Sequence, residues 1–140
     1  MKTRLLGVAI LSLLTAFAQN LGYEPDRDWR APAPAASQSN PLLAKPQAAA
    51  GGQKLFLRNC AECHRADGAG VENKHSADLQ LPVVQQQSDG TLFWKITNGH
   101  ASRGMPSFSK LPALERWQLV LFIRTLKPAG SQAPDNTIRN

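Results

Sequence analysis

The sequence predicts an all-α domain in which three main helices are joined by long loops. Three segments, residues 51–64, 88–99 and 112–128, place apolar side chains at helical spacing. No segment shows the alternation of polar and apolar residues that is typical of a strand, and the connecting stretches, such as "RADGAG", are marked by glycine and proline. Because so small a domain can bury only a limited core, we expect an apolar group to fill its centre.

The first two helices each have a clear start and an apolar face. The segment 51–64 opens on a glycine pair, and one helical face carries Leu55, Phe56, Asn59, Cys60 and Cys63. In the segment 88–99, Ser88 suits the N-cap and Gly99 a left-handed C-cap. The apolar face of this second helix consists of Leu92, Phe93 and Ile96.

The third helix is apolar on two sides. Pro112 suits its first turn and Pro128 ends it. One side follows the i, i+3, i+4, i+7 spacing with Leu119, Phe122, Ile123 and Leu126, and a second side carries Trp117, Val120 and Leu121. A helix that is apolar over so wide a surface is expected at the centre of the domain.

Residues 1–18 have the pattern of a cleavable export signal. Lys2 and Arg4 precede an apolar run, and small residues follow it at Ala16 and Ala18. The alternative is an uncleaved membrane anchor, but the run is shorter than the roughly 20 apolar residues that a spanning helix needs. We therefore expect a periplasmic or otherwise exported protein, which associates with the membrane through this N-terminal segment only if the segment is retained.

Residues 19–50 are rich in proline, alanine, serine and glutamine and show no sustained period, which predicts a linker or extended arm. Tyr23 and Trp29 are exceptions in this polar stretch: they either dock on a partner, dock back on the domain, or are incidental. The domain itself is expected to span residues 51–128, followed by a flexible tail at 129–140.

The chain has a formal net charge of +6, and beyond the export signal the excess lies within residues 51–128. A modest basic surface can steer a protein to an acidic partner or an anionic lipid face. Without a basic run or interleaved aromatic residues, it does not indicate nucleic-acid binding. Five cations flank the segments that carry the candidate site: Lys54, Arg58, Arg65, Arg103 and Lys110.

The stretch "CAECH" at residues 60–64 places two thiols and an imidazole within five positions, which is compatible with a redox dithiol, a metal site or a haem. A redox dithiol would need Cys60 and Cys63 at the start of a helix that follows a strand, whereas here they close a helix. A zinc site would need four ligands, nominally drawn from Cys60, Cys63, His64, His75 and His100, but Cys63 and the adjacent His64 cannot easily reach one small ion. Cys-x-x-Cys-His is the attachment signature of a c-type haem, in which two thiols add to the two vinyl groups and the histidine reaches the iron.

Met105 is the candidate for the sixth ligand of the haem iron. It is the one methionine beyond the export signal, and it stands between Gly104 and Pro106 rather than within a helical pattern. A lone methionine is often a core residue, but a proline-restrained loop suits a ligand held at fixed depth. His100 is the fallback ligand, and His75 is a weaker one.

With these residues in place, the chain resembles the class I monohaem cytochromes c over roughly residues 51–128. The resemblance rests on "G-x-x-L-F-x-x-x-C-A-x-C-H", "D-G-x-L-F-W-K-I-T-N-G", "M-P-S-F" and "R-W-x-L-V-x-F-I-R-T-L", and it is closest to short bacterial exported cytochromes. It implies a cytochrome c fold around one covalently bound haem c. In such a fold the first and last helices cross, here with Gly52 and Phe56 against Leu119 and Phe122.

The chain departs from this pattern directly after the haem-binding motif. Arg65 stands where the family commonly has glycine, and the first proline afterwards is Pro82. In the family a proline near this point supplies the backbone carbonyl that accepts the N–H of the haem-ligating histidine. Some carbonyl is still expected to orient His64, with Pro82 as a weak candidate.

An iron held by His64 and Met105 has no open position, so the expected function is one-electron transfer between a donor and an acceptor redox protein rather than catalysis. One alternative is a haem-bearing subunit tethered by residues 19–50 to a membrane or periplasmic oxidoreductase. A peroxidase or gas sensor becomes an option only if Met105 leaves the iron.

Overall fold

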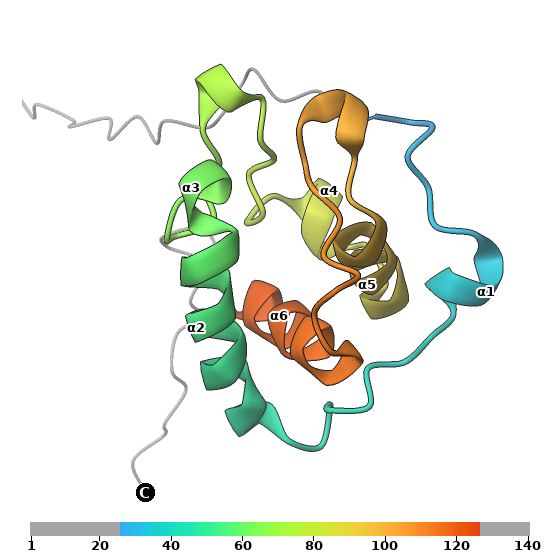
Figure 1. Cartoon of the computed structure of the whole chain (residues 1–140). Helices are drawn as coiled ribbons and strands as arrows, with labels where there is room; N and C mark the ends of the chain where they lie inside the picture. Colours follow the sequence, from blue (N-terminus) through green and yellow to red (C-terminus); the bar gives the residue numbers. More distant parts are fainter. Residues whose placement is uncertain (1–25, 127–140) are drawn as a thin grey trace, which may run out of the picture.

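Three helices form the frame of the protein, in a computed structural model that describes residues 26–126 (Figure 1). They are α2 (Ala49–Asn59), α5 (Asp89–Asn98) and α6 (Ala113–Thr125). Single turns precede and connect them. Before α2 come α1 (Ala33–Ala36) and a 3-10 turn at Pro46–Ala48; between the main helices lie α3 (Ala61–His64), α4 (Pro82–Gln85) and 3-10 turns at Glu72–Lys74 and Ala101–Arg103. The described residues contain no sheet, so the predicted all-α fold with three main helices and long loops is confirmed.

Helices α2 and α6 cross in close contact (Figure 1). A Cβ atom at Gly52 would collide with the backbone carbonyl of Gln118 and lie 3.0 Å from the Cβ atom of Phe122, so the two backbones meet where α2 has no side chain. Beside this point the rings of Phe56 and Phe122 pack with their centroids 5.1 Å apart. The contact that the family resemblance implied is therefore present.

The core lies between these three helices. Phe56, Leu119 and Val120 are almost completely buried, and Leu55, Leu92, Ile96 and Ile123 surround them. On α6, Trp117 is stacked on Phe93 of α5, with ring centroids 4.0 Å apart. Helix α6 thus contacts both α2 and α5, as its two apolar sides predict.

The helix boundaries differ from the predicted ones mainly at the first helix. The predicted helix at 51–64 is two helices, because the backbone at Cys60 leaves the helical geometry (φ −121°, ψ −33°) and α3 starts again at Ala61. Ser88 caps α5 as predicted, since its side chain accepts the Thr91 N–H. Gly99 ends α5 with φ 66° and ψ −169°, which is outside the left-handed helical region that the sequence predicted.

Residues 26–48, most of the predicted arm, are folded onto the helices. The side chain of Asn40, 3% exposed, donates to the Trp117 carbonyl, and Leu42 is part of the core. Gly90 of α5 lets the backbone of α1 approach so closely that a Cβ atom there would collide with the Ala35 carbonyl oxygen and lie 3.0 Å from the Ala36 carbonyl oxygen. This part of the arm is integral to the folded domain.

Some of the sequence predictions concern residues that the structure does not describe. The export signal at 1–18 and the tail at 129–140 lie outside residues 26–126, as do Tyr23 and Pro128. Within residues 26–126, none of the helices has the length and apolar character needed to cross a bilayer.

Candidate haem-binding site

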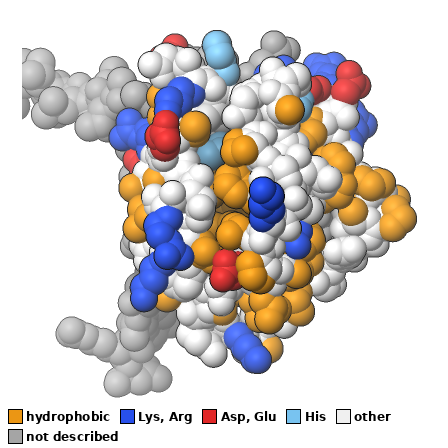
Figure 2. Space-filling view, viewed as in Figure 1, with side chains coloured by type: hydrophobic (Ala, Val, Ile, Leu, Met, Phe, Trp, Pro, Cys, Tyr) orange, Lys and Arg blue, Asp and Glu red, His pale blue; other side chains and the backbone are white. Residues whose placement is uncertain are grey.

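A cavity of about 380 Å³ lies between the helices and the loop that follows α5. Its apolar lining comes from Phe56, Leu79, Val84, Leu92, Ile96, Phe108, Leu119 and Ile123. Figure 2 shows apolar side chains around a hollow on this face, with lysine and arginine side chains to either side. All four predicted site residues, Cys60, Cys63, His64 and Met105, line this one cavity.

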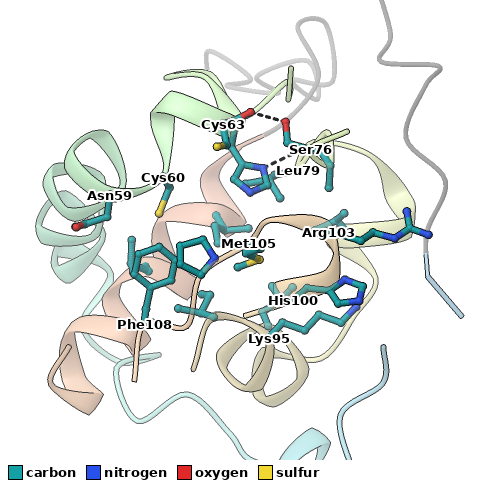
Figure 3. A pocket seen from close by; sticks show the side chains of 18 of the residues that line it. Asn59, Cys60, Cys63, Ser76, Leu79, Lys95, His100, Arg103, Met105 and Phe108 are labelled. Atoms are coloured by element: carbon teal, nitrogen blue, oxygen red, sulfur yellow. Dashed lines mark hydrogen bonds between the residues drawn. The ribbon is translucent and has the colours of Figure 1, made fainter. Parts of the chain in front are cut away.

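The two cysteines are free thiols at the start and near the end of the α3 turn. The break at Cys60 ends α2, and one helical turn later Cys63 faces the same cavity (Figure 3). Burial, with a smaller effect of the neighbouring Cys63, raises the pKa of the Cys60 thiol to about 12. Because a redox dithiol works through a thiolate of lowered pKa, this environment favours the neutral thiol and does not suit such chemistry.

His64 is held in one tautomer by a backbone carbonyl. Its Nδ1 atom lies 3.0 Å from the Ala77 carbonyl oxygen, which can only accept, so Nδ1 carries the proton and Nε2 keeps a free lone pair. Burial lowers the pKa of His64, and the hydrogen bond to Ala77 partly opposes this shift. At neutral pH this shift favours the neutral imidazole, whose Nε2 is then available to a metal.

The acceptor for His64 is Ala77, not the weak candidate Pro82. The loop after α3 folds back on itself, with hydrogen bonds from Gly70 N–H to the His64 carbonyl (3.1 Å) and from Leu79 N–H to the Gly68 carbonyl (2.7 Å). These contacts bring the Ala77 carbonyl beside the imidazole, whereas Pro82 starts helix α4. No periodic signal in this loop could have indicated Ala77.

Met105 is fixed by backbone contacts within the loop that follows α5. His100 and Met105 form an antiparallel bridge in which the His100 N–H donates to the Met105 carbonyl (2.8 Å) and the Met105 N–H to the His100 carbonyl (3.1 Å). Gly104 has φ 79°, and Gly99 has φ 66° at a point where a Cβ atom would lie 2.5 Å from the Pro106 carbonyl. Figure 3 shows Met105 between the two cysteines on one side and His100 on the other.

The rival histidines also line the cavity. The ring of His100 is stacked on Trp29, with centroids 4.7 Å apart, and its Nε2 atom lies 3.1 Å from Asp26 Oδ2. His75 follows the 3-10 turn Glu72–Lys74. Throughout residues 26–126, no three His, Cys, Asp or Glu side chains are grouped so that they could hold a metal ion, and the zinc set considered from the sequence does not converge.

Three cations line the cavity: Lys74, Lys95 and Arg103. Of the five cations that the sequence singled out, Arg103 alone is among them. Lys95 Nζ lies 4.4 Å from the ring centroid of Trp29, and burial lowers the pKa of Lys95, with Asp26 opposing the shift. Trp29 and Lys95 are site residues that sequence reasoning missed, although Trp29 stood out as a large aromatic in a polar stretch.

These residues fit a covalently bound haem. They supply two thiols separated by one helical turn, an imidazole with a directed lone pair, and a thioether on a braced loop. The remaining lining is mostly apolar, which suits the faces of a porphyrin.

The helical fold and this site together define a monohaem cytochrome c domain. A family model described as cytochrome c oxidase, cbb3-type, subunit III matches residues 47–123, and the chain belongs to this family. Membership implies electron transfer by a haem. Searches of curated proteins and of solved structures give no significant match.

Proposed function

We propose that this protein carries single electrons on one haem c, which is joined to Cys60 and Cys63 by thioether bonds and ligated by His64 and Met105. The observation that carries this proposal is the meeting of all four side chains at one largely apolar cavity. The tautomer of His64 supports it, because the hydrogen bond to Ala77 directs the proton to Nδ1 and leaves Nε2 for the iron.

A haem bound here would supply the one-electron chemistry, by cycling between ferric and ferrous iron. The residues of the chain set the conditions for this exchange. The Met105 thioether, a soft ligand, favours the ferrous state, and the apolar lining disfavours the additional positive charge of the ferric state. If His64 and Met105 both ligated the iron, no coordination position would remain for a substrate, and the protein would act as an electron carrier rather than as an enzyme.

We further propose that this carrier works with a membrane-bound oxidase on the exported side of the membrane. The name of the family, subunit III of a cbb3-type cytochrome c oxidase, supports this partner. Because residues 26–48 pack on the domain itself, this part of the arm would not serve as a free tether to the complex. Membranes that contain a cbb3-type oxidase should oxidise the reduced holoprotein in the presence of oxygen, and a rate equal to that of oxidase-free membranes would contradict this partner.

Replacement of Met105 tests the ligand set directly. In Met105→Ala we expect loss of the sulfur-to-iron absorption band at the red edge of the ferric spectrum, together with rapid CO binding by the ferrous protein. His75→Ala is the matched control, since it removes a rival ligand that lines the same cavity, and it should keep the band. Persistence of the band in Met105→Ala, or rapid CO binding by the unaltered protein, would exclude Met105 as the sixth ligand.

A further inference from the structure

A short N-terminal segment, residues 26–30, lies against the loop that carries Met105 (Figure 3 shows the His100 side of this loop). The indole N–H of Trp29 donates to the Gly99 carbonyl at 3.1 Å. The Trp29 ring is stacked on His100, with an angle of 16° between the planes. One side chain thus contacts two consecutive residues at the start of the loop.

Two charged side chains complete this contact. Lys95, on the last turn of α5, lies over the Trp29 ring, and Asp26 reaches His100 from the same segment. Cation–π contacts and aromatic stacking each contribute more when they are partly shielded from water, as they are at this cavity edge. Residues 26–30 therefore link α5 to the beginning of the loop.

The contact reaches Met105 through the backbone. His100, which Trp29 covers, exchanges two backbone hydrogen bonds with Met105. If His100 moves, Met105 loses the two backbone hydrogen bonds that fix its position in the loop. Trp29 contacts Gly99 and His100 rather than the Met105 thioether, so its effect on Met105 is indirect.

The segment is itself anchored at other points. Farther along the chain, the Ala36 carbonyl accepts the Ser88 hydroxyl at 2.6 Å, and buried Asn40 bonds to α6. Because these anchors keep residues 26–30 near the loop, the contact has little loop-closure entropy to overcome. The segment also lies outside residues 47–123, to which the family model is matched.

We propose that Trp29 is a positioning residue that holds the Met105 loop closed over the cavity, with residues 26–30 acting as a strap. The strap limits opening of the loop and thereby limits access of small diatomic ligands to the iron. The effect of the strap on ligand access rests on the proposed ligand role of Met105. Its effect on loop opening does not.

Hydrogen exchange of the holoprotein, full chain, tests the strap. The amide N–H of His100 donates a hydrogen bond to the Met105 carbonyl, and that of Met105 donates to the His100 carbonyl. The rate at which these two amide protons exchange therefore reports loop opening. In Trp29→Ala, which loses a hydrogen bond and a stack, we expect their exchange to be at least about tenfold faster. Trp29→Phe keeps the stack and should give an intermediate rate. Arg27→Ala, an exposed neighbour on the same segment, should leave both rates unchanged.

The amides of α2 and α6 distinguish positioning from general destabilisation. Unchanged exchange in these helices, together with faster exchange in the loop, supports the strap. A uniform increase in all helices of Trp29→Ala, or no change at His100 and Met105, would overturn it. Trp29→Phe also keeps the test decisive if Trp29→Ala does not fold.

CO binding by the ferrous protein is the second readout. We expect Trp29→Ala to bind CO at least about tenfold faster than the unaltered protein, because opening of the loop releases the sixth position. Equal rates would overturn the role of the strap in access. A missing sulfur-to-iron band in the unaltered protein would instead contradict the proposed ligand role of Met105, while the exchange measurement would still decide on the strap.

Discussion

Arg65, the residue that follows the haem-binding motif, has an unusual backbone conformation. Its φ of 61° and ψ of 161° lie in a region that is normally reserved for glycine. Its N–H caps the α3 turn by donating to the Ala61 carbonyl at 2.8 Å. The backbone at this position therefore has a conformation that suits glycine, although the side chain is an arginine. The ion pair with Asp67, at 3.4 Å, is largely exposed to solvent and contributes little to stability.

We expect Arg65→Gly to raise the free energy of unfolding by about 1 kcal/mol. The substitution relieves a strain of about 1–3 kcal/mol, while the greater freedom of glycine in the unfolded chain costs about 0.4–1 kcal/mol. Urea unfolding of the holoprotein measures the difference. Arg58→Gly, on helix α2, is the control and should lower stability by up to about 1 kcal/mol. If both substitutions destabilise the protein equally, Arg65 is not strained.

At the level of single residues, sequence reasoning found side chains but not the backbone groups that orient them. Cys60, Cys63, His64 and Met105 stand out by residue type and spacing, and they line one cavity. Ala77 does not stand out, because its role lies in a carbonyl that is placed by turns of an irregular loop. The sequence of such a loop carries no period from which the position of a carbonyl can be inferred.

Among the elements, the crossing of α2 and α6 depends on one position without a side chain. A Cβ atom at Gly52 would meet the backbone of Gln118, which cannot move without shifting α6. At the preceding residue, Gly51, a Cβ atom would meet the end of the Gln118 side chain at 2.8 Å, and this flexible group can turn away. Two adjacent glycines of one helix thus have different tolerance for alanine.

Gly52→Ala should lower the free energy of unfolding by about 1–3 kcal/mol, the usual cost of forcing extra atoms into a packed contact. Gly51→Ala should be neutral or stabilise the protein by up to about 1 kcal/mol, because alanine is the better helix former. Thermal unfolding of the two holoproteins, measured side by side, checks this difference. Equal effects of the two substitutions would mean that α2 and α6 are not in close contact at Gly52.

Among the helices, sequence patterns predicted the main elements but not the break within the first one. The helices near 88–99 and 112–128 were predicted by caps and apolar spacing, and both are present as α5 and α6. The break at Cys60 was missed, because helical spacing continues from α2 into α3. The packing of residues 26–48 was missed as well, since it depends on single contacts across the chain, such as that of Asn40 with Trp117.

For the whole molecule, the central feature is an apolar cavity inside a small helical domain. The sequence predicted that an apolar group fills the middle, because so small a domain with long loops can bury only a limited core of its own. In the structure, α6 packs on α2, while its Leu119 and Ile123 also line the cavity. A haem held there would complete the core as well as carry the electron.

Intact-mass spectrometry of the denatured protein, produced together with a haem-attachment apparatus, tests the central claim most directly. We expect that the unfolded polypeptide keeps the added mass of one haem and that Cys60→Ser combined with Cys63→Ser loses it. A polypeptide of bare mass, whose pigment is extracted by acidified acetone, would contradict covalent attachment at Cys60 and Cys63.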